Sequence, residues 1–346
     1  GALSNRNLVI NGACQVAQRG TSTTGIGASS VFGSVDRFQV ASGTTGRVTM
    51  AQDSVTDLAG FTKCIKISCT TARTPSASEL MFLRYAWEGH DLQSISKGTA
   101  SAKPTKISFY VKASGVFNMA CELYDADNNR HISQLFATST SWNRIELDIP
   151  ADTTGAYGND TGPGLLMQLW FHGGTDRTSG TLPSAWETKS SNTNQAAGID
   201  NFLSSTSNEL YFTGLQYEIG TEATPFEHRS FSDDLTLSQR YYNRSYPYGI
   251  ATAATDNDTP IHHMSRGGGF NIIGQFFHPR DMRAAPTVVI YNPLNGTVNQ
   301  LKGDSSSFAN AAVLKNTAKG TVFFVNSTTI TETVFLSVHA TFDAEI

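Results

Sequence analysis

The chain of 346 residues carries little charge and few cysteines, and it has no long apolar run. Asp, Glu, Lys and Arg make up 16% of it, against about 25% in a typical soluble domain. The net charge is −4 and no Lys/Arg run occurs, so the basic stripe that neutralises nucleic-acid phosphates is missing. No apolar stretch approaches the ~18–20 residues that a membrane-spanning helix needs. We therefore expect neither a nucleic-acid partner nor membrane insertion.

Cysteine usage also limits the chemistry. The chain has no C-x-x-C pair, and its cysteines lie within apolar, strand-like segments at Cys14, Cys64, Cys69 and Cys121. We expect buried free thiols and no zinc site. Residues 1–7 lack the charged and apolar regions of a signal peptide, so we expect synthesis in a cytoplasm.

Helical periodicity is almost absent, and short alternating apolar segments separated by Gly, Asn, Asp, Ser and Pro take its place. Alternation with period 2 predicts half-buried strands, and many short strands predict a sandwich or barrel. The predicted strands are Lys106–Lys112, Arg144–Ile149, Leu165–Phe171, Glu209–Glu218, Thr287–Tyr291, Thr321–Val325 and Val334–Asp343.

One segment departs from this pattern. Ser232 can cap a helix that continues through Leu235–Tyr242, and Tyr246-Pro247 is expected to end it. The predicted organisation is therefore a β domain at 1–230, a short helical linker at 231–246 and a smaller β-sandwich at 247–346.

Several stretches resemble tailed-bacteriophage virion and tail-fibre proteins that carry a jelly roll similar to a carbohydrate-binding module. The most specific is Phe212–Arg229 (FTGLQYEIGTEATPFEHR), which by its own residues is expected to be an architectural brace. The other stretches are Asn7–Gly20, Val35–Phe38, Lys103–Ala113, Trp142–Gly155, Leu237–Tyr246 and Met282–Thr287.

The resemblance implies an all-β chain whose N-terminal domain is a jelly-roll β-sandwich. It also implies a structural role in the virion, as a fibre or appendage subunit for host attachment. The expected partners are other virion proteins, further copies of the chain in a homotrimer, and a host-surface glycan. The expected location is the surface of the phage particle.

Two other functions remain open. A capsid-surface decoration protein would use the jelly roll to grip neighbouring shell subunits. A polysaccharide depolymerase would need paired carboxylates such as Asp176 and Glu187. The chain has no G-x-S-x-G nucleophile elbow, no H-E-x-x-H zinc helix and none of the strand repeats typical of depolymerases. We therefore expect a protein that is not an enzyme.

Sugar binding would require aromatic faces beside polar groups, and the long polar segment 172–200 is the natural place to look for them. Trp186 is the first candidate, followed by Tyr157, His172 and Asp176. Trp186 can equally well be a packing residue.

Asp125, Asp127 and Asn129 have the alternating oxygen spacing of a calcium loop. The sixth position of that loop is Arg130 instead of Gly, and the twelfth is Phe136 instead of Glu. A hairpin turn explains the same residues, so no cofactor is expected and calcium is the less favoured alternative.

Overall fold

The computed structural model describes residues 5–256, 258–266, 270–303, 307–309, 311–326 and 333–346. The chain divides into two compact units. The first comprises Thr21–Phe231 and the residues before Gln18, and the second comprises Gln18–Gly20 and Ser232–Ile346. None of the described helices is long and apolar enough to cross a membrane.

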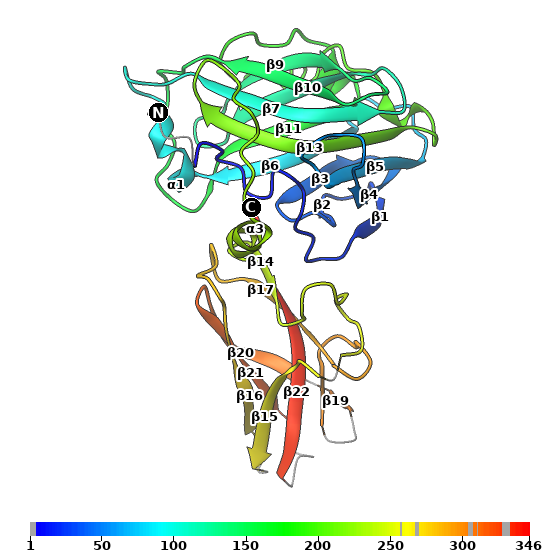
Figure 1. The fold of residues 1–346 in the computed structure, drawn as a ribbon, viewed down its shortest axis with the longest axis vertical. Coiled ribbons are helices and arrows are strands. Elements are labelled where there is room, and N and C mark those ends of the chain that lie inside the picture. Colours follow the sequence, from blue (N-terminus) through cyan, green and yellow to red (C-terminus); the bar gives the residue numbers. More distant parts are fainter. Residues whose placement is uncertain (1–4, 257, 267–269, 304–306, 310, 327–332) are drawn as a thin grey trace. The chain divides into compact units, whose positions relative to one another are not determined.

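The first unit is a jelly-roll β-sandwich of two antiparallel sheets that lie face to face (Figure 1). The first sheet runs, in spatial order, β1 (Ser22–Ile26), β4 (Arg47–Ser54), β5 (Lys63–Thr71), β13 (Glu209–Ile219), β7 (Thr105–Ala113) and β10 (Asn143–Ile149). The second sheet runs β12 (Glu187–Thr188), β9 (Arg130–Ala137), β8 (Asn118–Asp125), β11 (Pro163–Gly173), β6 (Leu80–Glu88), β3 (Phe38–Gly43) and β2 (Val31–Phe32).

Short helical turns connect some of these strands. They are α1 (Gly89–Leu92), α2 (Thr175–Thr178) and the 3₁₀ turns η1 (Gln93–Ile95) and η2 (Phe202–Ser204). Segment 172–200, expected to be irregular, contains α2 and β12, and β12 extends the second sheet by pairing with β9.

Alternating side chains build the core between the two sheets. Phe212 from β13 meets Phe109 from β7 and Phe38 from β3, with ring centroids 5.2 and 5.9 Å apart. All three side chains are fully buried, and aromatic residues of this size contribute a large share of the apolar area removed from water. The strands predicted around these residues are confirmed. All four cysteines are buried free thiols, as predicted.

Gly214 marks an irregularity in β13. The register with β7 shifts between Thr213 and Gln216, and Gly214 has a φ of +65°. An added Cβ would lie within 3 Å of the Tyr110 and Phe61 side chains. Only glycine satisfies both the left-handed backbone and the close approach.

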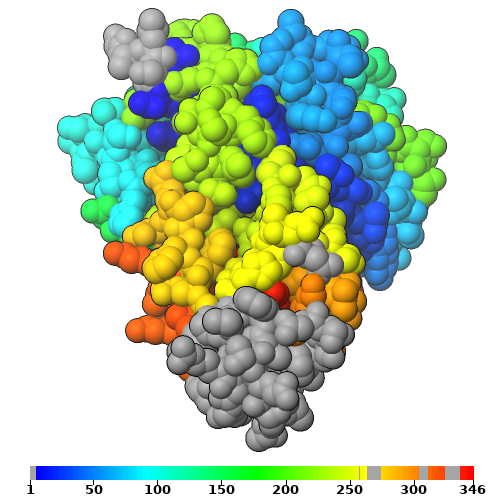
Figure 2. Space-filling model, turned by 60° about the horizontal axis from the view of Figure 1, so that its bottom comes forward, coloured from blue at the N-terminus to red at the C-terminus, as the bar shows by residue number. Residues whose placement is uncertain are grey.

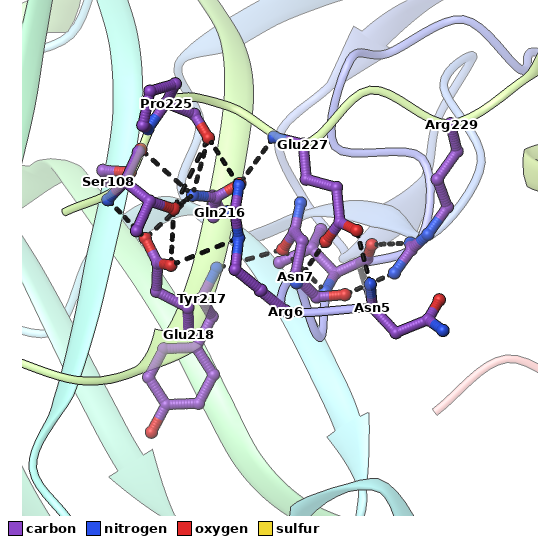
Figure 3. A network of polar contacts seen from close by, with 12 residues as sticks. Asn5, Arg6, Asn7, Ser108, Gln216, Tyr217, Glu218, Pro225, Glu227 and Arg229 are labelled. Atoms are coloured by element: carbon purple, nitrogen blue, oxygen red, sulfur yellow. Dashed lines mark hydrogen bonds and ion pairs between the residues drawn. The ribbon is translucent and has the colours of Figure 1, made fainter. Parts of the chain in front are cut away.

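The segment after β13 holds the N-terminal segment against the sandwich (Figure 3). The Glu227 carboxylate accepts hydrogen bonds from the backbone amides of Asn5 and Asn7, at 2.5 and 2.8 Å. The Arg229 guanidinium donates to the carbonyls of Asn7 and Val9. Partial burial disfavours the charged form of Glu227, but these backbone amides outweigh burial and lower its carboxyl pKa. We call these five residues the N-terminal clamp.

A second set of bonds shapes the turn that carries the clamp. The Glu218 carboxylate accepts from Gln216 Nε2 at 2.8 Å and from both the amide and the hydroxyl of Thr224. Gln216 Oε1 in turn accepts from the Glu227 amide at 2.8 Å. The sequence block Phe212–Arg229 therefore acts as the brace that its residues predicted.

The second unit consists of two antiparallel sheets organised around one long strand (Figure 1). β22 (Thr333–Asp343) pairs with β14 (Tyr242–Arg244), β15 (Ile261–Arg266), β17 (Thr287–Tyr291) and β18 (Gln300–Lys302), and β18 pairs with β19 (Ser307–Ala309). The other sheet runs β16 (Phe270–Phe277), β21 (Gly320–Asn326) and β20 (Ala311–Thr317). Leu336, Val338, Ala340 and Phe342 of β22 fill the core, as the alternation predicted.

The helix at the start of residues 232–346 corrects one expectation. α3 spans Phe231–Ser238, so Ser232 lies inside the helix and is not its cap, and the helix ends four residues before Tyr242. The reason is tertiary: Tyr242–Arg244 pair with Thr341–Asp343 as β14, which takes their backbone groups away from a helix. Tyr246-Pro247 therefore follows a strand.

Candidate functional site

The outer face of the second sheet of the jelly roll carries side chains that the core does not use. On β11, Met167 and Leu169 point into the core, so Gln168 and Trp170 face outward. On β6, Leu83 and Tyr85 fill the core, and Arg84 faces outward for the same reason.

Four polar side chains form a continuous row across this face. Strand register pairs Gln39 with Arg84, Arg84 with Gln168, and Gln168 with Glu122. Directly opposed residues in antiparallel strands have Cβ atoms about 5 Å apart. The row therefore crosses β3, β6, β11 and β8, and we call it the polar row.

Glu122 is fully buried, and its carboxylate is satisfied inside the protein. It accepts from Trp170 Nε1 at 3.0 Å and from Gln195 Nε2 at 3.1 Å, and His131 Nδ1 lies 2.9 Å away. The Lys189 ammonium is 3.8 Å from the same carboxylate. Burial lowers the pKa of Lys189, and Glu122 partly opposes this effect. At this end of the row, the charges of Glu122 and Lys189 therefore have partners within the protein.

The rest of the row has unused hydrogen-bonding capacity. Arg84 is half-buried, and within the part of the chain that is described its guanidinium makes no hydrogen bond or ion pair. Burial alone lowers its pKa. Gln39 is 8% exposed, and its Oε1 is buried without a hydrogen bond. Most buried polar groups in proteins are hydrogen-bonded, and these two side chains depart from that pattern.

An aromatic pair lies beside the polar row. Phe82 lies two residues before Arg84 on β6, and Trp170 lies two residues after Gln168 on β11. Their ring centroids are 4.4 Å apart. Ala196, from the segment that follows β12, packs on this pair. The segment 172–200 therefore covers part of the outer face, which explains why β11 is buried on both sides.

A polar pocket of about 280 Å³ opens on the same face. Tyr124 of β8 is on the outward face two residues after Glu122, and its ring centroid lies 4.5 Å from the Lys189 ammonium. Its hydroxyl hydrogen-bonds Asn129 at 3.2 Å. Ser190, Ser191 and Asn192 complete the lining. The pocket thus combines one aromatic face with several hydroxyl and amide groups.

The residues singled out from the sequence fall into two separate places. Trp186 is half-buried, packs against the core and donates from Nε1 to the Pro150 carbonyl at 3.0 Å. Tyr157 is 7% exposed. The Lys97 ammonium lies 5.5 Å from the ring centroid of Trp186 and 5.2 Å from that of Tyr157. Tyr157 also lines a second pocket of about 280 Å³.

His172 and Asp176 lie elsewhere. His172 is fully buried, with Nδ1 2.8 Å from Asn201 Oδ1 and Nε2 3.7 Å from a carboxylate oxygen of Glu79. Burial lowers the pKa of His172 despite these two neighbours. Asp176 is exposed at the start of α2. The four residues therefore do not form one site.

The proposed calcium ligands have other partners. Asp125 is fully buried and bonds the Lys97 ammonium at 2.5 Å, so this lysine supplies the positive charge that a cation would bring. Asp127 accepts from the Gly158 amide at 2.8 Å, and Asn129 bonds Tyr124. The three residues belong to the β8–β9 hairpin.

The second unit contains a serine, a histidine and an aspartate in contact. His339 Nδ1 lies 2.9 Å from the Ser245 hydroxyl, and Nε2 lies 3.6 Å from a carboxylate oxygen of Asp256. The imidazole is fully buried and stacks on Tyr246, with ring centroids 3.9 Å apart. The Ser245 oxygen also accepts from the Ala340 amide. These contacts attach the loop that follows β14 to β22, and Figure 2 shows part of that loop, coloured yellow, at the surface.

No protein-family model matches the chain, and no curated protein sequence matches it. Among solved structures, the CBM22-1 xylan-binding domain of Paenibacillus barcinonensis Xyn10C is 11% identical with a TM-score of 0.30, covering 65% of this chain and 100% of that one. The family 11 carbohydrate-binding module from Clostridium thermocellum, solved with a mixed-linked tetrasaccharide, is 12% identical with a TM-score of 0.29, covering 59% and 99%.

The enzymatically active domain of tailspike protein 4 of bacteriophage CBA120 is 10% identical, with a TM-score of 0.31. That match covers 62% of this chain and 21% of the tailspike chain. At such low identities and scores, these similarities transfer no function.

Sequence reasoning missed the polar row and the pocket beside Tyr124. One signal was present: Arg84 and Gln168 each interrupt an otherwise apolar strand, in LMFLRYAWE and PGLLMQLWFHG. A polar residue in the middle of such a strand needs a partner on one of its faces. Which strands lie side by side could not be read from the chain.

Proposed function

We propose that this chain is a non-catalytic structural subunit of a tailed-phage virion whose jelly roll binds a glycan on the host surface. The observation that carries the glycan part is the polar row. Arg84 and Gln39 have hydrogen-bonding groups on an outer sheet face that find no partner among the described residues, and planar amides and guanidinium groups suit sugar hydroxyls. The aromatic face of Tyr124, in the pocket on the same side, can stack on a pyranose ring.

The virion part rests on the sequence resemblance of Asn7–Gly20 and Phe212–Arg229 to tail-fibre proteins. The chain would be a fibre or appendage subunit on the particle surface, assembled as a homotrimer with other virion proteins. Several copies binding at once would raise a weak single-site affinity by about 10²–10⁴-fold where the geometry permits.

Affinity electrophoresis tests the glycan part. The purified chain is run through gels containing bacterial capsular polysaccharide, lipopolysaccharide, xylan or mixed-linked glucan. We expect retardation in at least one gel, and Tyr124→Ala should weaken it about tenfold through lost ring stacking. Tyr211→Ala, on the outer face of the first sheet, is the matched control and should bind as wild type. Binding that is insensitive to Tyr124→Ala would remove the pocket from the site.

Antibody labelling of particles in the electron microscope tests the virion part. Label on a tail or fibre supports an attachment role, whereas label spread over the capsid shell favours the decoration alternative. Release of reducing sugar from a bound polysaccharide would contradict a non-catalytic role. Light scattering on the purified chain should give three times the monomer mass.

A further inference from the structure

Arg84 presents a charge that nothing in the described sandwich balances. Its Nε is buried without a hydrogen bond, and the guanidinium has no carboxylate partner among the residues that are described. A guanidinium cannot shed its proton in a protein, so this site keeps its charge. Holding a charge partly out of water without a counter-charge costs stability.

Glu122, the acidic member of the polar row, does not supply that counter-charge. Glu122 lies two strands from Arg84, and its oxygens are bonded by Trp170 and Gln195, with His131 beside them. Between the two charges stands Gln168, which is uncharged and makes no side-chain hydrogen bond within the described part of the chain. The only influence that shifts the pKa of Arg84 is burial, which agrees with the absence of a nearby carboxylate.

Lys189, another cation on this face, is in a different situation. It lies 3.8 Å from Glu122 and over the ring of Tyr124, so its charge has internal partners. Arg84 therefore has no carboxylate partner among the described residues, and it is flanked across the strands by the amides of Gln39 and Gln168.

We infer that the glycan bound by this face is acidic, with a carboxylate of a uronic acid residue paired to Arg84. This inference rests on the proposed glycan-binding function and specifies its ligand class. A guanidinium fork binds a carboxylate through two parallel hydrogen bonds. The amides of Gln39 and Gln168 stand on either side of that position, where they can bond the neighbouring hydroxyls of the chain.

The experiment compares a polysaccharide with its own uncharged form. Titration calorimetry measures binding of the full chain to polygalacturonate, alginate and hyaluronan, and to each after reduction of its carboxyl groups. Dextran sulfate shows whether any polyanion suffices. The variants are Arg84→Gln and Arg84→Lys, and Arg47→Gln on β4 of the first sheet controls for loss of one positive charge.

We expect wild type to bind at least one acidic polymer tenfold or more tightly than its reduced form. Arg84→Gln should lose that preference, Arg84→Lys should keep part of it, and Arg47→Gln should match wild type. Added salt should weaken binding of the acidic form only. Without ligand, Arg84→Gln should melt at the same temperature as wild type or higher, because an unbalanced charge is removed.

Each alternative result contradicts a defined claim. Equal binding of acidic and reduced polymers, unchanged in Arg84→Gln, overturns the acidic ligand and leaves glycan binding intact. Equal binding of dextran sulfate and the uronic acid polymers overturns the carboxylate assignment. A clear fall in melting temperature for Arg84→Gln would make Arg84 a structural residue. Binding to none of the polysaccharides, neutral or acidic, would remove both the inference and the proposed function.

Discussion

At the scale of single residues, Lys97 is a buried cation with four oxygen partners. Its ammonium lies 2.5 Å from Asp125 and 3.1 Å from Asp152, and it donates to the carbonyls of Thr154 and Gly155. The lysine thus lies between the Asp125 carboxylate at the end of β8 and the Asp152 carboxylate after β10, which also pairs with Arg130. Such a pair contributes little net stability by itself, but removing one partner leaves the others buried and charged.

We expect Lys97→Met to lower the free energy of unfolding by about 3–5 kcal/mol, because the fully buried Asp125 loses its counter-charge, whereas Asp152 keeps its ion pair with Arg130. Chemical denaturation followed by tryptophan fluorescence measures the change. Lys103→Met is the matched control, since Lys103 is exposed and donates only to the Ser94 carbonyl. Similar losses in the two variants would contradict the role given to Lys97.

At the scale of elements, the polar row and the N-terminal clamp both depend on contacts between segments that are far apart in the sequence. Each brings together residues distant in sequence through strand register or a shared turn. The clamp joins Asn5 and Asn7 to Glu227 across 220 residues or more. The sequence indicated that Phe212–Arg229 was a brace, but it did not identify the segment that is braced.

Glu227→Ala should destabilise the first unit by about 1–3 kcal/mol, because two backbone amides lose their acceptor. Urea unfolding monitored by tryptophan fluorescence measures this, since all four tryptophans precede residue 231. Glu222→Ala, at an exposed position of the same turn, should unfold as wild type. A Glu227→Ala variant as stable as Glu222→Ala would show that the clamp is dispensable.

At the scale of the whole molecule, the two units have separate cores. His278, in the second unit, is 8% exposed, and both of its ring nitrogens are buried without hydrogen bonds. It packs against Phe342 and Phe276. Burial lowers its pKa to about 4, although Asp281 opposes the shift.

The sign of the pH effect follows from this pKa. Between pH 6.5 and about 4 the unfolded imidazole takes up a proton while the folded one remains neutral. The second unit should therefore lose stability as the pH falls through this window, by at most about 3 kcal/mol, and keep it in full above pH 6.5. His278→Phe should reduce this slope, because phenylalanine fills the same aromatic site without titrating, and the buried His339, whose pKa burial also lowers, should account for the slope that remains.

Circular dichroism at several pH values follows unfolding of the whole chain, and tryptophan fluorescence follows the first unit alone. The dependence of the unfolding free energy on pH should differ between wild type and His278→Phe when circular dichroism measures it. Tryptophan fluorescence should give the same dependence for both. His262→Phe, at an exposed position of the same unit, should keep the wild-type slope. Equal slopes in wild type and His278→Phe would contradict the buried neutral state of His278.

The sequence by itself determined the fold class and most strand positions, because period-2 alternation is a local property that each segment carries alone. It also indicated the buried cysteines and the brace. It misplaced the end of α3, because pairing of Tyr242–Arg244 with β22 overrode a local helical preference.

Only the tertiary structure decided the candidate site. Gln39, Arg84, Gln168 and Glu122 come from four strands, and only strand order and register make them neighbours. The residues selected from composition, such as Trp186 and His172, proved to be packed or bonded within the sandwich. A residue's chemistry can be read from the chain, but its surroundings depend on long-range pairing, which a single sequence does not specify.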